Sequence, residues 1–173
     1  MSEQHGTGSA PEGSGRGVRW LEPGAGEARW VLGELDTVKA TADQTGGLFG
    51  CKETVAPKGS GPPLHVHEHE DEACYLLEGE ITFFVGDETI SASAGSWVYL
   101  PRGIPHTLRV ESDEARSLWL TVPGAFESFF VEAFPVAAAG SSPPDEPVDL
   151  ALVAQAAAGY GVTIMGPPPG ATA

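Results

Sequence analysis

Short segments of apolar or alternating residues follow one another along most of the chain, and turn-forming residues separate them. The breaks fall at Gly46-Gly47, at 57–63, at Glu78-Gly79, at 86–87 and at 101–105. Regularly spaced short strands predict an all-β sandwich or barrel, and no long helical stretch interrupts them as a parallel βαβ arrangement would require. The expected strands are residues 29–32, 35–41, 48–56, 64–67, 73–77, 81–85, 89–92, 96–100, 107–110 and 117–122.

The period of the pattern changes after residue 122. Phe126, Phe129, Phe130 and Ala133 fall at i, i+3, i+4 and i+7, which is one face of a helix. We expect a short helix there that covers one mouth of the barrel, and a second helix at about 148–158. The closing Pro-rich stretch should be extended or frayed.

The chain divides accordingly into a tail and one domain. Residues 1–17 are rich in Gly and Ser, so they cannot offset the entropy of ordering and should form a disordered tail. Residues 18–173 should form a single domain, with a barrel core at about 28–122 and a helical C-terminal extension at 124–173. A length of 173 residues suits one domain of this kind.

Charge and composition exclude several partners. The net charge is −15, from 24 acidic and 9 basic residues, which argues against nucleic-acid binding. The sequence has no apolar run of membrane-spanning length and no secretion signal, so we expect no membrane partner and a cytoplasmic protein. Two cysteines, Cys51 and Cys74, are too few for a disulfide scaffold, and whether they bond to each other stays open.

The segment 59–79 carries candidate metal ligands. His65 and His67 are two residues apart on an expected strand, so their side chains leave the same face. Glu72 stands where the chain enters the next strand and can meet the two imidazoles. We expect the neighbouring His69 and Glu70 to lie on a solvated rim. Glu70 is the carboxylate that competes with Glu72 for the role of ligand.

A third imidazole comes from the segment 95–106. A hydrophobic strand ends at Pro101, a Pro-Arg-Gly turn reverses the chain, and His106 opens the next strand. A lone His or Glu inside an apolar barrel would be costly, whereas three imidazoles and one carboxylate around a cation would satisfy one another. The set His65, His67, Glu72 and His106 suits one divalent transition metal, Fe, Mn, Co, Ni, Cu or Zn, without selecting among them.

At these residues the chain resembles the cupin superfamily, which implies a jelly-roll β-barrel. The stretch 123–130 after the barrel is also similar to the helix entry of single-domain bacterial flavonol (quercetin) 2,3-dioxygenases. The matching positions are Gly59-x5-His65-x-His67-x4-Glu72-x6-Gly79 for the first cupin motif and Gly95-x5-Pro101-x-Gly103-x2-His106 for the second.

The second resemblance implies a metal-dependent dioxygenase. Such an enzyme opens a flavonol-like or other aromatic enol with dioxygen and releases carbon monoxide, and Glu72 would be both ligand and general base. Two alternatives stay open: a non-redox cyclase or isomerase that acts on a polyketide or small molecule, and a binding module without turnover. The fold alone does not select among these functions.

Strand parity gives a candidate pocket for the small, aromatic substrate. Residues that share the face of Glu72 are Cys74 and Leu76, and those that share the face of His106 are Leu108 and Val110. An apolar wall beside a polar metal suits a flat aromatic molecule. We also expect a homodimer, formed through the N-terminal strands at 18–35, because cupins commonly pair there.

Overall fold

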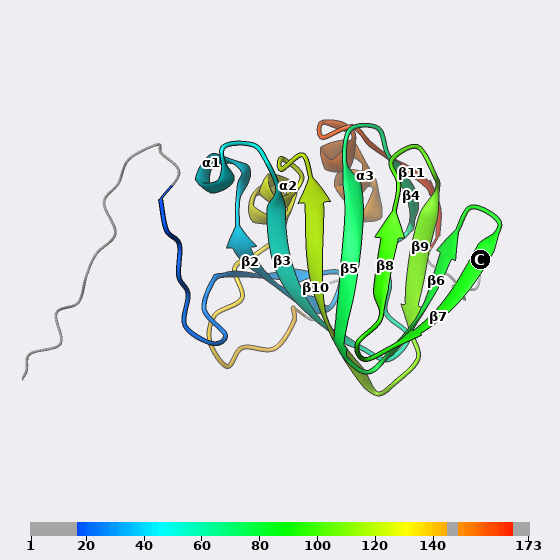
Figure 1. Ribbon diagram of the computed structural model, residues 1–173, viewed down its shortest axis with the longest axis horizontal. Helices are drawn as coiled ribbons and strands as arrows, with labels where there is room; N and C mark the ends of the chain where they lie inside the picture. The colour runs from blue at the N-terminus through cyan, green and yellow to red at the C-terminus, as the bar shows by residue number, and fades with distance from the viewer. Residues whose placement is uncertain (1–16, 145–148, 168–173) are drawn as a thin grey trace, which may run out of the picture.

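The protein, seen here in a computed structural model that describes residues 17–144 and 149–167, is built from two antiparallel sheets (Figure 1). The six-stranded sheet has the order β1-β2-β3-β10-β5-β8, and the five-stranded sheet has the order β11-β4-β9-β6-β7. The first contains β1 (Glu27–Val31), β2 (Glu34–Ala40), β3 (Gly50–Pro57), β10 (Glu114–Val122), β5 (Asp71–Glu78) and β8 (Trp97–Leu100). The second contains β11 (Val162–Gly166), β4 (Leu64–His67), β9 (His106–Val110), β6 (Glu80–Val85) and β7 (Glu88–Ser93). The expected all-β, jelly-roll barrel with short C-terminal helices is therefore confirmed.

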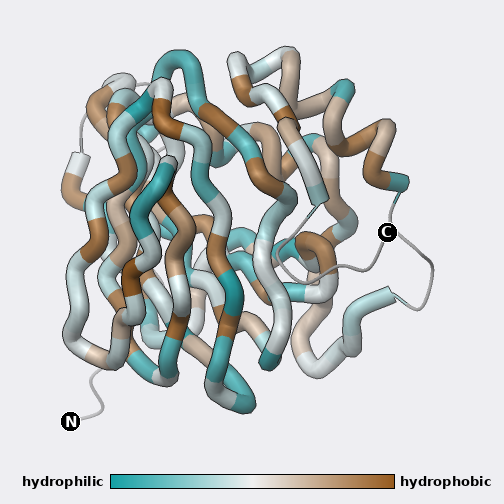
Figure 2. Tube along the Cα trace, turned by 90° about the vertical axis from the view of Figure 1, so that its right-hand side faces the viewer, coloured by the Kyte–Doolittle hydropathy of each residue, from teal (hydrophilic) through white to brown (hydrophobic). Residues whose placement is uncertain are grey.

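Alternation along the strands places the core between the sheets. On β10, Ala115, Ser117, Trp119 and Thr121 are buried, while the residues between them are more exposed. Apolar and polar residues accordingly alternate along the tube in Figure 2. The barrel core combines residues of both sheets, among them Phe83.

In the described residues, three helices accompany the strands: α1 (Ala42–Thr45), α2 (Glu127–Ala133) and α3 (Leu150–Ala158). The two expected C-terminal helices are present. α3 begins after Asp149, whose carboxylate accepts hydrogen bonds from the backbone N–H groups of Ala151 and Leu152. Val148, where we expected this helix to begin, lies outside the described residues, as do 168–173 at the Pro-rich end and all but Gly17 of the expected disordered tail.

Every expected strand overlaps an observed one, but the pattern missed β11. This strand follows α3 directly and pairs antiparallel with β4, with Val162 opposite His67 and Ile164 opposite His65. The C-terminal extension therefore adds the strand β11 to the barrel. It lies beside β4, which carries the candidate ligands His65 and His67.

The C-terminal extension packs as a second hydrophobic cluster. Phe126, Phe129, Phe130 and Phe134 are buried together with Val31 of β1 and Val162 of β11. The chain beyond α2 also pairs with the outer edge of β1, since the Trp30 N–H donates to the carbonyl of Pro135. The expected homodimer through the N-terminal strands stays a prediction, and part of that edge is already paired within the chain.

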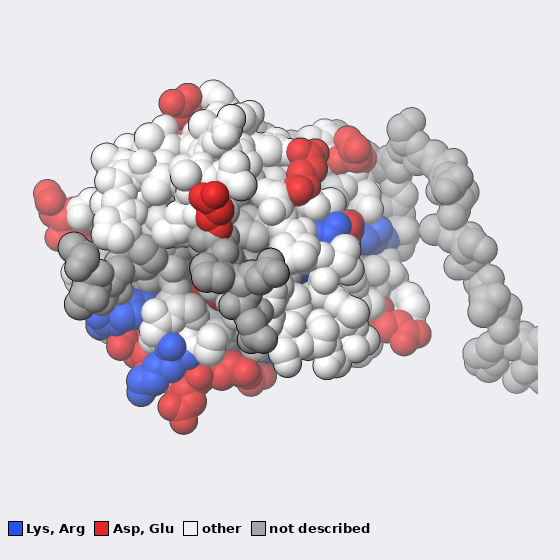
Figure 3. All heavy atoms as spheres, turned by 180° about the vertical axis from the view of Figure 1, so that it is seen from behind, with Lys and Arg blue, Asp and Glu red and all other residues white. Residues whose placement is uncertain are grey.

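The charged side chains on the surface reflect the excess of acidic residues in the sequence. Acidic side chains are spread over the face in Figure 3, and the basic ones on that face lie beside them. None of the helices described is both long and apolar enough to cross a membrane. Cys51 and Cys74 both carry free thiols.

Candidate metal centre

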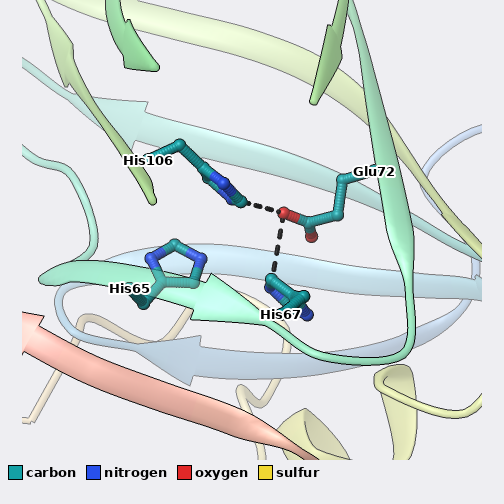
Figure 4. A group of neighbouring side chains, drawn as sticks. All are labelled: His65, His67, Glu72 and His106. Atoms are coloured by element: carbon teal, nitrogen blue, oxygen red, sulfur yellow. Dashed lines mark hydrogen bonds and ion pairs between the residues drawn. The ribbon is translucent and has the colours of Figure 1, made fainter. Parts of the chain in front are cut away.

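The four predicted ligands converge inside the barrel (Figure 4). His65 and His67 project from β4, Glu72 from β5 of the opposite sheet and His106 from β9, where it stands directly opposite His65 in the ladder. All four side chains are buried, and one potential ligand atom from each lies within 4.8 Å of the others. Two ligands on opposite sides of a transition metal are at most about 4.4 Å apart, so an ion requires only a small contraction.

Backbone carbonyls orient two of the imidazoles. Nδ1 of His65 lies 2.8 Å from the carbonyl oxygen of Pro63, and Nδ1 of His106 lies 2.9 Å from that of Ile104. A carbonyl oxygen can only accept, so each Nδ1 carries the proton. The neutral ring then has its lone pair on Nε2, and this is the arrangement that a metal-binding histidine requires.

The carboxylate of Glu72 completes the group. Its Oε2 atom lies 3.0 Å from Nε2 of His106 and 3.4 Å from Nε2 of His67. With Nδ1 protonated, Nε2 of His106 needs either a second proton or a cation to face this anionic oxygen, because two acceptors would repel each other at this distance. A shared cation removes the repulsion, so the donor set fits a divalent metal.

Electrostatics favour the protonation states that a metal site requires at His65 and Glu72, but not at His106. Burial, together with the neighbouring His106, lowers the pKa of His65 to about 4, so this imidazole is neutral at pH 7. Burial opposes the ionisation of Glu72, but the charge of His67 and the contact with His106 outweigh it and hold the pKa of this carboxyl well below its usual range. Burial also acts against protonation of His106, whose pKa is nevertheless raised by Glu72.

Glu70 occupies a different position from the expected one. We expected it on a solvated rim, but it is only 3% exposed, and its Oε2 atom lies 3.5 Å from Nδ1 of His67. Glu70 thus sits behind the imidazole rather than beside the candidate ion. His69 is exposed and lies against Gly161, where an added Cβ would be 2.6 Å from the His69 ring.

A cavity of about 110 Å³ adjoins the centre. His65, Glu72 and His106 form part of its wall, and most of the remainder is apolar. Leu108 and Val110 line it as expected, whereas Cys74 and Leu76 are buried in the barrel core and are not among its lining residues. Strand parity places all four side chains on inner faces, but the cavity occupies only part of the interior.

Much of the cavity wall consists of residues that the sequence pattern did not predict to lie there. The phenylalanines of the C-terminal extension line the cavity, and the ring of Phe126 stands edge-on to His67 with centroids 4.6 Å apart. Val162 and Ile164 of β11 also line it. The helical spacing of the phenylalanines was visible in the sequence, but its contact with the centre was not.

Comparison with known proteins agrees with this geometry. The family model described as the cupin domain matches residues 51–123, a range that includes all four candidate ligands. The chain contains a cupin domain. The cupin is 31% identical over 110 residues to quercetin 2,3-dioxygenase of Bacillus subtilis (strain 168), which covers 64% of this chain and 33% of that protein. It is 28% identical over 97 residues to the enzyme of the same name from Aspergillus japonicus. That match covers 52% of this chain and 28% of the Aspergillus enzyme. The cupin thus matches about a third of the length of these curated relatives.

Solved structures support the fold alone. KdgF from Halomonas sp. superposes with a TM-score of 0.57 at 15% identity, over 65% of the cupin and 98% of that chain. Oxalate decarboxylase from Bacillus subtilis superposes with a TM-score of 0.55 at 19% identity, over 65% of this chain and 31% of the decarboxylase chain. The shared feature is the β-barrel fold.

Proposed function

We propose that this cupin is a metal-dependent dioxygenase that opens a flavonol-like or other aromatic enol substrate. The observation that carries the proposal is the convergence of three imidazoles and one carboxylate beside an apolar cavity, whose wall includes His65, Glu72 and His106. The names of the two curated relatives support the reaction class. The substrates are then dioxygen and a small aromatic molecule.

His65, His67, Glu72 and His106 would hold one divalent transition metal. The ion would supply positive charge that stabilises the deprotonated hydroxyl of the enol. Glu72 is the base that accepts this proton. Its Oε2 atom makes both imidazole contacts, so Oε1 remains available to the substrate hydroxyl. The ring then takes up both atoms of dioxygen and opens with the loss of carbon monoxide.

The surrounding side chains would position the substrate and exclude water. Aromatic rings from Phe126, Phe129 and Phe130 provide flat, apolar surface beside the centre. An apolar cavity of about 150 Å³ holds one benzene ring, so a flavonol needs the phenylalanine side chains to move apart. These residues belong to the cluster of the C-terminal extension, which is distinct from the barrel core and can shift without opening the barrel.

Elemental analysis of the purified protein, combined with oxygen uptake in the presence of flavonols, tests the proposal. We expect about one transition-metal ion per chain, and oxygen consumption accompanied by carbon monoxide. Glu72→Gln should lower the rate by roughly 100-fold or more if Glu72 is the base. His69→Ala, a change at an exposed neighbour, is the matched control.

Three results would contradict the proposal. Cyclisation or isomerisation of a substrate without oxygen would select a non-redox enzyme instead. Stabilisation by a ligand without any product would select a binding module. A protein that takes up no metal would remove the basis for either enzyme.

A further inference from the structure

Two ionisable side chains on the cavity wall have no role in the proposed chemistry. Glu34 of β2 and Lys52 of β3 both line the cavity that also reaches His65, Glu72 and His106. They come from neighbouring strands of the six-stranded sheet. The remaining wall is mostly apolar, so these groups make a second polar area within it.

The ladder places this area away from the metal centre. Thr121 of β10 pairs with Gly50 of β3 on one side and with Glu72 of β5 on the other. Lys52 is two residues beyond Gly50 along β3. Two strand spacings of about 4.8 Å and two residue steps of about 3.4 Å put the Cα atoms of Lys52 and Glu72 roughly 12 Å apart. A substrate that touches both areas must therefore be elongated.

The ammonium of Lys52 is fixed by its neighbours and still has free donor hydrogens. Its ammonium lies 2.5 Å from Oδ2 of the fully buried Asp36, whose Oδ1 accepts a hydrogen bond of 2.5 Å from the hydroxyl of Thr54. On another side the ammonium lies 4.0 Å from the centre of the Phe130 ring. An ammonium has three donor hydrogens, and Asp36 occupies one. The fixed cation can therefore donate to a ligand in the cavity.

Glu34 provides a complementary group. Burial and the charge of Asp36 raise the pKa of Glu34 to about 8, although Lys52 and a hydrogen bond from Ser60 oppose the shift. The carboxyl is therefore mostly protonated at pH 7, with a hydroxyl that donates and a carbonyl oxygen that accepts. Such a group can exchange hydrogen bonds with a phenol without the cost of burying a full negative charge.

We infer that Glu34 and Lys52 recognise a hydroxyl group on the far end of an elongated aromatic substrate whose enol lies at the metal centre. The inference rests on the proposed function and narrows its substrate class. A site built to hydrogen-bond a substrate hydroxyl rejects the analogue that lacks it, because its buried polar groups are then left unpaired. The substrate is thus a phenol-bearing enol rather than a purely apolar one.

Equilibrium binding to the full chain loaded with zinc and kept free of oxygen tests the inference. The probes are 3-hydroxyflavone and 3,4′-dihydroxyflavone, which share the enol and differ only in the distal hydroxyl. We expect the wild-type protein to bind the dihydroxy compound at least about tenfold more tightly. Glu34→Leu should bring the two affinities together, and Glu34→Gln should keep part of the preference. Glu88→Gln, at an exposed position of β7, should keep all of it.

The results separate this inference from the proposed function. Equal affinities in the wild type, or an unchanged ratio in Glu34→Leu, would overturn the recognition site while leaving the metal centre in place. Failure of both flavones to bind the wild type would overturn the proposed flavonol-like substrate as well. Circular dichroism of each variant shows whether it is folded. Lys52 is not substituted, because its removal would leave Asp36 buried without a counter-charge.

Discussion

His67 lies between two carboxylates: Glu72 is 3.4 Å from its Nε2 atom, and Glu70 is 3.5 Å from its Nδ1 atom. His67 is fully buried, and neither ring nitrogen has a hydrogen bond within the part of the chain that the structure describes. His65 and His106 differ, because a backbone carbonyl fixes each of them. Glu70 therefore takes for His67 the place that the carbonyls take for the other two rings.

Glu70→Gln should weaken metal binding by about 10-fold to 100-fold, because a carboxylate behind a ligating imidazole fixes its orientation and raises its basicity. Competition with a chelator of known affinity measures the change. Glu68→Gln, at the neighbouring exposed position, provides the control. Equal affinities in the two variants would mean that Glu70 does not orient the ring.

Removal of one ligand should abolish stoichiometric metal binding. His65→Ala and His106→Ala each leave three ligand residues, and we expect the bound metal to fall from about one ion per chain to a small fraction of that. Elemental analysis after dialysis measures the content. His69→Ala should retain the metal, since its side chain faces Gly161 rather than the centre. Full metal content in both ligand variants would contradict the assignment.

The stability of the metal-free protein should fall on acidification. The pKa of His65 is about 4 in the folded chain and about 6.5 in the unfolded one, so between these values only the unfolded chain binds the proton. This contribution to the free energy of unfolding is complete above pH 6.5 and is lost as the pH falls towards 4. It amounts to at most roughly 3 kcal/mol. Urea unfolding at pH 7 and pH 5 should show a smaller loss for His65→Gln than for the wild type.

Glu34 should give the opposite dependence. Its pKa is about 8 in the folded chain against 4.5 for an unperturbed glutamate, so folding favours the protonated form. The associated stability is complete below pH 4.5 and is lost as the pH rises through 8. The difference in melting temperature between Glu34→Gln and the wild type should therefore grow in favour of the variant from pH 5 to pH 8. A difference that is flat with pH would mean that Glu34 ionises normally.

Phe129→Ala should destabilise the fold by about 3–5 kcal/mol, because it empties the centre of the cluster that joins α2 to the barrel. Its ring lies 5.0 Å from that of Phe126 and 5.5 Å from that of Phe134. Chemical unfolding measures the loss. Leu152→Ala on α3, where the side chain is 62% exposed, should change the free energy by no more than about 0.5 kcal/mol. Similar losses at the two positions would contradict this account of the cluster.

The sequence alone predicted the barrel and the four residues of the metal centre. Strand parity put His65 and His67 on one face, and the fixed spacing to Glu72 and His106 matched a known motif. Both signals are local, because alternation along a strand and the position of a turn depend on residues close in the chain. The convergence of the four side chains is present in the structure, and its occupation by a metal stays a prediction.

Tertiary structure alone decided what surrounds the centre. Glu70 looked like part of a charged rim, yet its side chain is buried behind His67, because a turn of the chain rather than strand alternation sets its direction. The residues of β11 were expected to belong to a helical C-terminal extension, but they pair as a strand with β4. Glu34 and Lys52 reach the same cavity as residues of other strands because the sheets close over it. Such contacts join residues far apart in the chain, and the local pattern of a single sequence does not encode which distant strand will face which.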